Sequence, residues 1–537
     1  MTPRRPFLLL MLLSFVLLSC TEKVPDNYRQ ADVLPPVYPD YADVTVPVNI
    51  APLRFEVFAH ADAAVTRFSS GSSEIVCGGL KVCPPVDEWH DMLAAAQGSD
   101  VSVEVFIRDE GQWQRFQPFS IHVSPDSIDP WISYRLISPS YVSYEELTIN
   151  QRCLENYDES VIVDNMLCST EFGGQCVNCH SYQQYNPQRM QFHARQTHAG
   201  TVIAYDGHLE KVDMRSDSLI SAGVYPAWHP WLKLIAYSTN KTMQSFHTSH
   251  PNKIEVLDSE SDLILYDIDS HRVTTIEREP DELEIYPAWS PDGRSLYFCS
   301  AHFHYASDSV NTEEIIMRAQ DVRYNIYRKA FDPDTRQFGP REMVFCADTL
   351  LRSATLPRIS PDGRWLLFTL GEWGCFHIWH HDADLWMMDL AGLESDSVAI
   401  GVDSAAIEVD STAIDVDSTA QSLTPATSVA RPLDEINSPD TESYHSWSSN
   451  GRWIVFSSRR HDGVFTRPFI AHIAADGHGA KPFELPCHDP DRHLQMLKSY
   501  NVPEFMRSPV TITPQQFAAT LRQKTHVQAI GDEHLGR

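Results

Sequence analysis

The unit that decides the fold is Tyr286-Pro287-Ala288-Trp289-Ser290-Pro291-Asp292-Gly293-Arg294-Ser295-Leu296-Tyr297-Phe298. It places an aromatic anchor before a turn and an apolar strand directly after that turn. Pro-Asp-Gly suits a tight turn, because proline presets one backbone angle and glycine accepts a positive φ. The unit therefore predicts two antiparallel strands joined by a short connection.

The same pattern occurs in three more places and is followed each time by a second apolar strand. The repeated units are residues 225–238, 356–368 and 444–456. The second strands of the four units are expected at residues 262–267, 324–327, 384–389 and 469–473. Multi-stranded units that recur roughly every 60 to 90 residues are typical of β-propellers. Four units would not close a ring comfortably, so we expect five or six blades, including less obvious ones such as residues 201–212.

A second motif, Cys176-Val177-Asn178-Cys179-His180, is the attachment signature of a c-type haem. The two thiols would bind the porphyrin covalently, and the adjacent imidazole would reach the iron. The alternative is half of a zinc site, which would need two more ligands at similarly short spacing. The sequence has no second Cys-x-x-Cys, so haem is favoured.

The N-terminus has the features of an exported lipoprotein. Arg4 and Arg5 precede an apolar run at residues 7–18, and the segment ends in Leu17-Leu18-Ser19-Cys20. This looks like a lipobox, in which Cys20 would carry the lipid; a plain secretory signal with an incidental cysteine is the alternative. Because c-type haem is attached outside the cytoplasmic membrane, the leader and the haem motif support each other.

Charge and cysteine content restrict the function classes. The formal net charge of −30 offers no basic face for nucleic acid. Export permits disulfides, for which Cys77 with Cys83 and Cys153 with Cys168 are the plausible local pairs. The other cysteines are expected to be buried thiols: Cys299, Cys346, Cys375 and Cys487.

These features predict a mainly β protein with several parts. We expect a signal peptide at 1–19, a tether at 20–45 and an immunoglobulin-like β-sandwich at 46–128 that contains a helix at 88–97. An irregular haem-binding segment would follow at 129–200, and the propeller at 201–486. An acidic, repetitive insertion at 395–430 is expected to be disordered. The tail at 487–537 would contribute one peripheral helix at 514–524.

The Ser-Pro-Asp-Gly-Arg units followed by apolar strands look like the blades of TolB-like (WD40-like) β-propellers, over roughly residues 200–485. Taken with the lipobox and the single haem motif, the whole chain resembles a group of uncharacterised bacterial lipoproteins that join such a motif to such a propeller. The resemblance implies a place in the cell envelope of a Gram-negative bacterium, anchored by lipid at the periplasmic face of the outer membrane.

The haem iron would take His180 as its proximal ligand and needs a sixth ligand or an open position. The residues considered are His198, slightly preferred, then His193, Met190 and His247. Histidine would give a low reduction potential and methionine a higher one. Each of these residues could instead be an ordinary hydrogen-bonded side chain. We interpret His380-His381-Asp382-Ala383-Asp384 as a blade-edge loop in preference to a metal site.

The leading functional hypothesis is a monohaem c-type cytochrome that transfers single electrons and whose propeller docks a redox or envelope protein. The alternative is a protein- or glycan-binding propeller with structural or sensory haem. A haem enzyme is a third hypothesis, and no catalytic residue is assigned. A serine peptidase is excluded, because too little chain follows the last blade and no Gly-x-Ser-x-Gly elbow is present.

Overall fold

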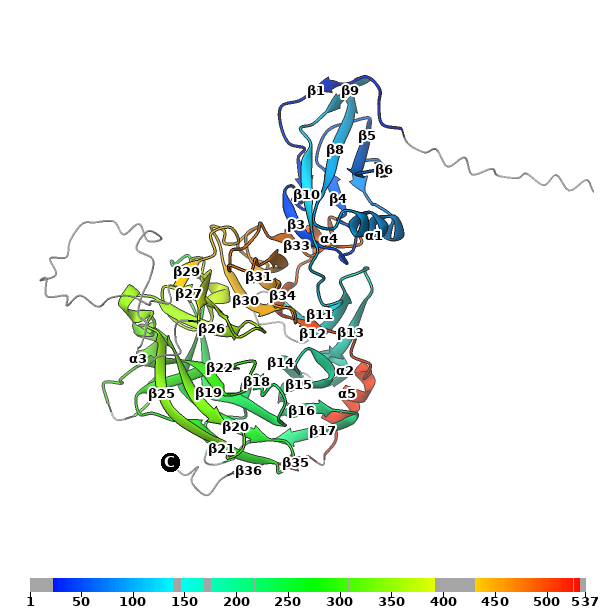
Figure 1. Ribbon diagram of the computed structural model, residues 1–537. Helices are drawn as coiled ribbons and strands as arrows, with labels where there is room; N and C mark the ends of the chain where they lie inside the picture. Colours follow the sequence, from blue (N-terminus) through cyan, green and yellow to red (C-terminus); the bar gives the residue numbers. More distant parts are fainter. Residues whose placement is uncertain are drawn as a thin grey trace, which may run out of the picture.

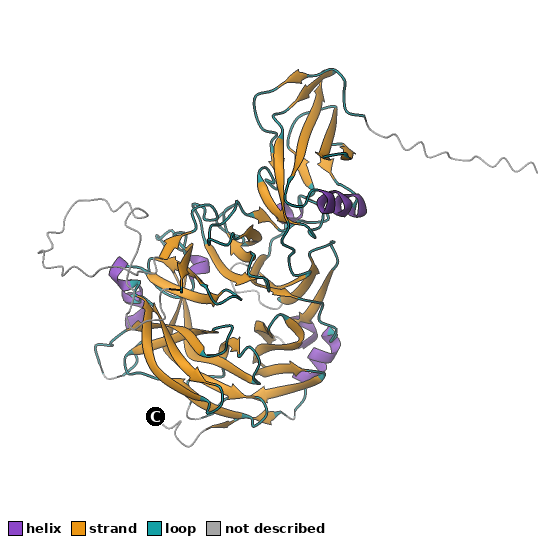
Figure 2. Ribbon diagram, viewed as in Figure 1, coloured by secondary structure: helices purple, strands orange, loops and turns teal. Residues whose placement is uncertain are grey.

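The computed structural model describes residues 23–138, 146–168, 175–216, 219–307, 309–391, 430–524 and 526–531. Strands dominate these residues, and the helices are few and short (Figure 2). The predicted signal peptide, Cys20 and nearly all of the predicted insertion lie outside the described residues. No helix among the described residues is long and apolar enough to cross a membrane.

The larger part of the chain forms six units of four antiparallel strands, called blades 1 to 6 here (Figure 1). Blades 3 and 4 share one continuous sheet through a single parallel pair, Ser261 with Leu283. In each blade the first strand named is the innermost. The strands are β34 (Ser499–Met506), β11 (Trp131–Ile137), β12 (Thr148–Cys153) and β13 (Glu159–Asp164) in blade 1; β14 (Gln175–Gln183), β15 (Asn186–Gln196), β16 (Gly200–Tyr205) and β17 (His208–Asp213) in blade 2; β18 (Val224–Trp228), β19 (Leu234–Phe246), β20 (Ile254–Asp267) and β21 (Arg272–Glu277) in blade 3; β22 (Glu282–Trp289), β23 (Ser295–His302), β24 (Asn325–Asp332) and β25 (Gln337–Phe345) in blade 4; β26 (Ser353–Ile359), β27 (Trp365–Gly371), β28 (Asp384–Asp389) and β29 (Ala430–Pro432) in blade 5; and β30 (Glu442–Trp447), β31 (Trp453–Ser458), β32 (Arg467–His472) and β33 (Phe483–Glu484) in blade 6.

The innermost strands form a closed ring. Each innermost strand contacts the next one, in the order β14, β18, β22, β26, β30 and β34, and β34 contacts β14 in turn. Blade 1 combines the late strand β34 with the early strand β11, which pair antiparallel from Trp131–Met506 to Ile137–Ser499. This pairing fastens the two ends of the ring together, and the whole arrangement resembles a β-propeller.

Every innermost strand carries the same bulge. In each blade the register with the neighbouring strand shifts where one non-glycine residue has a positive φ between 49° and 55°, and blade 2 has a second shift between Tyr182 and Gln183. These residues are Cys179, Tyr225, Tyr286, Leu356, Tyr444 and Val502. The residue that follows is proline in four blades and histidine in two, His180 and His445. The haem motif therefore occupies a repeated structural position of the ring.

The sequence boundaries of the ring were wrong at both ends. Residues 129–200 were expected to be irregular, but they contain β11 to β15, which belong to blades 1 and 2. The tail after residue 487 was expected to be peripheral, but it supplies β34. At the start of the ring the reason is that blade 2 turns at Gln184 and Tyr185, both at positive φ, without the Pro-Asp-Gly signal of blades 4 and 5.

The N-terminal domain packs on blade 6 (Figure 1). It has a seven-stranded and a three-stranded sheet and one helix, α1 (Val86–Ala95), near its predicted place. Its core, which includes Phe55, Phe68 and Trp89, continues into Trp453 and Ile470 of blade 6. Its strands are β1 (Arg29–Gln30), β2 (Val37–Tyr38), β3 (Val44–Pro47), β4 (Phe55–Val57), β5 (Ala63–Ser70), β6 (Ser73–Gly78), β7 (Lys81–Val82), β8 (Asp100–Asp109), β9 (Gln112–Arg115) and β10 (Phe119–Ser124).

The remaining elements are short and lie around the blades. The predicted C-terminal helix is present as α5 (Pro514–Leu521), capped by Thr513 and Gln516. The others are α2 (Asn165–Cys168), α3 (Thr312–Met317), α4 (Arg492–Gln495), β35 (Val527–Gln528) and β36 (Ile530–Gly531). The two predicted disulfide pairs are not formed, and their four cysteines are free thiols: Cys77, Cys83, Cys153 and Cys168.

Candidate functional site in the central channel

The haem motif lines a cavity of about 420 Å³ in the centre of the ring. Cys176, Cys179 and His180 all contribute to its wall, although strict strand alternation would turn Cys179 away from the other two. The bulge at Cys179 (φ 55°) breaks that alternation. The irregular backbone thus brings both thiols and the imidazole to one cavity.

The His180 ring is buried and chemically unsatisfied. The residue is 2% exposed, and neither of its ring nitrogens has a hydrogen-bond partner. Burial, followed by the nearby charge of Arg135, lowers the pKa of His180 to about 3, and the Val502 backbone acts in the opposite direction. The ring is therefore neutral at pH 7, which is the form that binds a metal.

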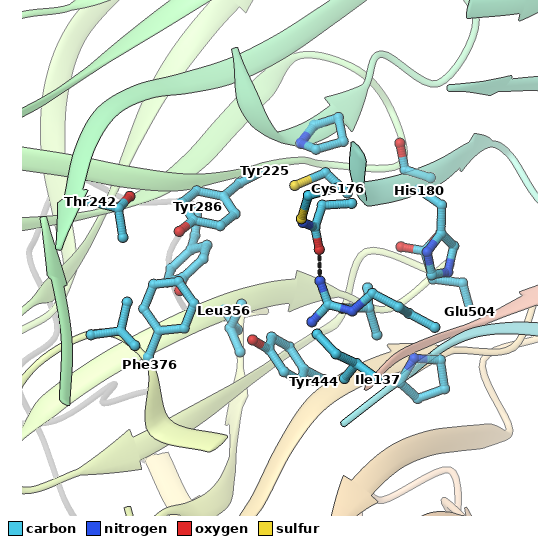
Figure 3. Close-up of a pocket in the computed structure, with 18 of the residues that line it drawn as sticks. Ile137, Cys176, His180, Tyr225, Thr242, Tyr286, Leu356, Phe376, Tyr444 and Glu504 are labelled. Carbon is cyan, nitrogen blue, oxygen red and sulfur yellow. Dashed lines mark hydrogen bonds between the residues drawn. The ribbon is translucent and has the colours of Figure 1, made fainter. Parts of the chain in front are cut away.

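The two cysteines are partly exposed free thiols. The Asn178 amide donates to Cys176 Sγ at 2.9 Å and in turn accepts from Arg135 Nη1 (Figure 3). Burial raises the pKa of the Cys176 thiol, and the charges of Arg195 and Arg135 oppose that rise. Two guanidinium groups therefore stand on the thiol side of the cavity.

Aromatic and aliphatic side chains make up most of the remaining wall. Tyr225 and Tyr286 lie across the cavity from His180 (Figure 3), with ring centroids 4.6 Å apart. Tyr444 belongs to the same wall. Phe376 packs against Tyr225, with the centroids of the two rings 6.1 Å apart. The cavity suits a flat, largely apolar ligand with a few charged groups.

An ion pair separates this cavity from a second cavity at the other end of the channel. Arg358 Nη2 of blade 5 lies 3.5 Å from Glu504 Oε1 of blade 1. Both residues line both cavities, together with Ser181 and Pro226. Burial raises the pKa of Glu504 to about 7, and Arg358 opposes that effect. The pair forms a charged partition across the ring.

The cavity residues fit a covalently bound haem. Thioether formation needs two free thiols facing one space, and Cys176 and Cys179 provide them. An axial bond needs an imidazole nitrogen that is not already engaged, and His180 offers two. The volume lies within the roughly 300–1,000 Å³ typical of ligand pockets.

None of the four predicted sixth ligands is among the residues that line this cavity. Met190 is fully buried between the sheets of blades 1 and 2 with Phe192. His193 Nδ1 lies 3.1 Å from Thr201 Oγ1, beside a separate cavity between blades 2 and 3. His198 lies in the turn after β15, and His247 pairs with Glu255 at 3.6 Å on the β19–β20 hairpin.

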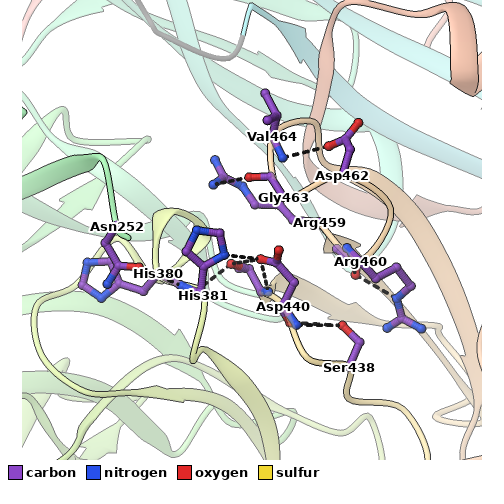
Figure 4. Close-up of polar contacts among 12 residues, drawn as sticks. Asn252, His380, His381, Ser438, Asp440, Arg459, Arg460, Asp462, Gly463 and Val464 are labelled. Carbon is purple, nitrogen blue, oxygen red and sulfur yellow. Dashed lines mark hydrogen bonds and ion pairs between the residues drawn. The ribbon is translucent and has the colours of Figure 1, made fainter. Parts of the chain in front are cut away.

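The His380–Asp384 loop of blade 5 makes polar contacts with the β19–β20 hairpin of blade 3 and with the segment before β30 of blade 6 (Figure 4). His380 Nε2 lies 3.2 Å from Glu255 Oε1, and His381 Nδ1 lies 2.9 Å from Asp440 Oδ1. Across the described part of the chain, no group of three or more His, Cys, Asp or Glu residues could hold a metal ion.

A separate buried cluster surrounds Cys487. The thiol lies 3.3 Å from His493 Nε2 and 3.4 Å from Arg152 Nη1, and His493 Nδ1 contacts Glu484. Although burial raises it, His493 and Arg152 bring the pKa of Cys487 down to about 7. At 3% exposure the thiol faces no solvent. The cluster therefore secures the segment that leads into β34.

Several cavity residues had no assigned role in the sequence. Tyr225, Tyr286 and Leu356 are the anchor residues of three repeated units, and each directly precedes a proline. This shared position was the sequence signal from which their place in the channel could have been predicted. Arg135 and Glu504 gave no signal, because blade 1 has no repeated unit.

Comparison with known proteins gives a fold resemblance. No protein-family model and no curated protein matches the chain. Among solved structures, TolB from Acinetobacter baumannii is similar at 12% identity and TM-score 0.39, over 78% of this chain and 84% of that one. The β-propeller domain of the Trilobed protease from Pyrococcus furiosus is similar at 10% identity and TM-score 0.28, over 72% and 82%.

Proposed function

We propose that the protein is a monohaem c-type cytochrome that carries its haem in the central channel. Cys176 and Cys179 would hold the haem covalently, and His180 would bind the iron. The observation that supports this best is the meeting of two free thiols and an unpartnered imidazole in one cavity. When bound, the haem would supply reversible one-electron chemistry.

The chain's own residues would bind and shield this group. The aromatic wall of Tyr225, Tyr286 and Phe376 would exclude water from it. Lipid on Cys20 would anchor the protein at the periplasmic face of the outer membrane of a Gram-negative bacterium. The TolB-like propeller and an immunoglobulin-like N-terminal domain would dock a redox or envelope protein.

A second function is favoured by the tyrosine-rich wall of the channel. Tyr225, Tyr286 and Tyr444 would suit a protein or glycan ligand, with the haem structural or sensory. This binding protein would show no reversible exchange of electrons with a redox partner. A redox titration of the purified protein against artificial mediators of graded potential distinguishes the two functions.

The direct test is a pyridine haemochrome spectrum of protein made with c-type maturation machinery. We expect a c-type band in the native protein and its loss in a Cys176→Ala/Cys179→Ala variant. A Cys83→Ala/Cys346→Ala variant, which alters two cysteines outside the channel, is the matched control and should keep the band. Native protein without covalent haem would refute the proposal.

A further inference from the structure

The ring order fixes which wall of the channel faces the two cysteines. Between β14 and β26 stand two innermost strands on either side, β18 and β22 one way and β34 and β30 the other. Strand β26 of blade 5 is therefore opposite β14. Any ligand attached to Cys176 and Cys179 at one edge extends its other edge toward blade 5.

Arg358 is the charged side chain that β26 contributes to the cavity. Its neighbours on that strand, Leu356 and Pro357, are apolar. The Arg358 side chain is 34% exposed, and its described ion pair with Glu504 is loose, at 3.5 Å. The guanidinium group thus has room for a further partner.

The other two arginines of the cavity stand on the thiol side. Arg195 is directly opposite Cys176 in the β14–β15 ladder. Arg135 donates to Asn178, which lies between the two cysteines. Neither is placed on the wall that the far edge of the ligand would meet.

The two opposite edges of a haem carry different chemical groups, just as the two opposite walls of this cavity do. Its vinyl groups, which become the thioether bonds, are on one edge, and two propionate carboxylates are on the opposite edge. We propose that Arg358 binds the propionate carboxylates of the haem, an inference that rests on the proposed function. A guanidinium group is the side chain best suited to a carboxylate, because its planar donors can form two parallel hydrogen bonds.

The test is the midpoint potential of the matured protein, measured by spectroelectrochemistry. Loss of a positive charge near the carboxylates stabilises the oxidised iron, so Arg358→Gln should lower the potential. We expect about a tenfold smaller equilibrium constant for reduction, which is 59 mV for one electron. Arg358→Lys should restore most of the difference. Arg364→Gln is the control, because Arg364 pairs with Asp389 on the outside of the same blade.

Two further measurements make the outcome decisive. Glu504→Gln removes the internal competitor of the carboxylates and should raise the potential, which tests Arg358 even if Arg358→Gln folds poorly. The haemochrome spectrum of each sample separates the two proposals. A c-type band in every variant with an unchanged potential overturns the role of Arg358 alone, whereas no band in the native protein overturns the haem as well.

Discussion

Blades 2 and 6 place a histidine at the same point of the same bulge, and the two histidines have opposite surroundings. His180 follows Cys179 (φ 55°), and His445 follows Tyr444 (φ 49°). Both rings are buried, at 2% exposure. His445 Nε2 lies 3.2 Å from the Leu367 carbonyl, and its Nδ1 lies 3.5 Å from Thr369 Oγ1, whereas both nitrogens of His180 lack a partner.

The difference separates a histidine whose hydrogen bonds the fold satisfies from one whose ring nitrogens are left for another partner. A buried polar group without a hydrogen bond costs about 1–3 kcal/mol, so a fold keeps one only where another interaction compensates. His445 is satisfied by blade 5, and it needs nothing more. His180 stands beside two free thiols, and a bond to iron would satisfy it. The bulge is common to the six blades, and the side chains on it differ in whether the fold satisfies them.

The largest expected effect comes from replacing each histidine by leucine in the matured protein. His180→Leu should abolish the spectrum of histidine-ligated haem, because it removes the proximal ligand. His445→Leu should keep that spectrum, because its nitrogens are engaged by blade 5. Visible spectra of the ferric and ferrous forms provide the measurement. Equal spectra for the two variants would remove the distinction between the histidines.

The same pair of substitutions should have the reverse effect on the stability of haem-free protein. His445→Leu leaves the Leu367 carbonyl without its donor and should lower the free energy of unfolding by about 1–3 kcal/mol. His180→Leu removes two desolvated nitrogens and should leave stability unchanged or increase it by about 1 kcal/mol. Urea unfolding in a Cys176→Ser/Cys179→Ser background measures both. A larger loss for His180→Leu would mean that its ring has a partner in solution.

A lower pH should destabilise the folded protein through both histidines in the same way. Burial first, followed by Arg135 for one and Arg358 for the other, lowers the pKa of His180 and of His445 to about 3. The value in the unfolded chain is near 6.5, so between these limits the unfolded state binds the proton and the folded state does not. Stability should therefore fall as the pH drops below about 6.5.

Each histidine should contribute about 2 kcal/mol to the loss of stability between pH 7.5 and pH 5, at about 1.4 kcal/mol per pH unit. Either leucine variant, in haem-free protein, should lose less stability over this interval than its parent by that amount. Unfolding curves at the two pH values test this. If a leucine variant loses as much stability between the two pH values as its parent, the ring of that histidine is already protonated in the folded protein.

The sequence predicted the blades whose turns are local and missed those whose closure is distant. Units such as 286–298 are complete hairpins, so their residues alone indicate blades. Blade 1 is completed by β34, which pairs with β11 from more than 350 residues away. Nothing local in residues 499–506 indicates that partner. The Cys-x-x-Cys-His motif likewise singled out three residues that line one cavity, but it did not indicate that a blade strand would carry them.

The four candidate sixth ligands lie outside the lining of the cavity for a related reason. Their nearness in sequence to His180 suggested nearness in space, which holds in a compact loop. In blade 2 the chain turns back as β15, so Met190 and His193 lie on the next strand outward. The residues that do face the cavity come from all six blades, between Arg135 and Glu504, and only the closed ring brings them together.

The smallest expected effect concerns the bulge itself, at Val502 of blade 1. Val502 has φ 51°, a conformation that is unfavourable by about 1–2 kcal/mol for most residues and worst for a β-branched one. Asparagine tolerates it, so Val502→Asn should raise the free energy of unfolding by about 0.5–1 kcal/mol. Val256 lines the same cavity without a positive φ, and Val256→Asn should be destabilising. If both variants lose stability equally, packing of Val502 outweighs its backbone strain, and the six bulges are held by their side chains.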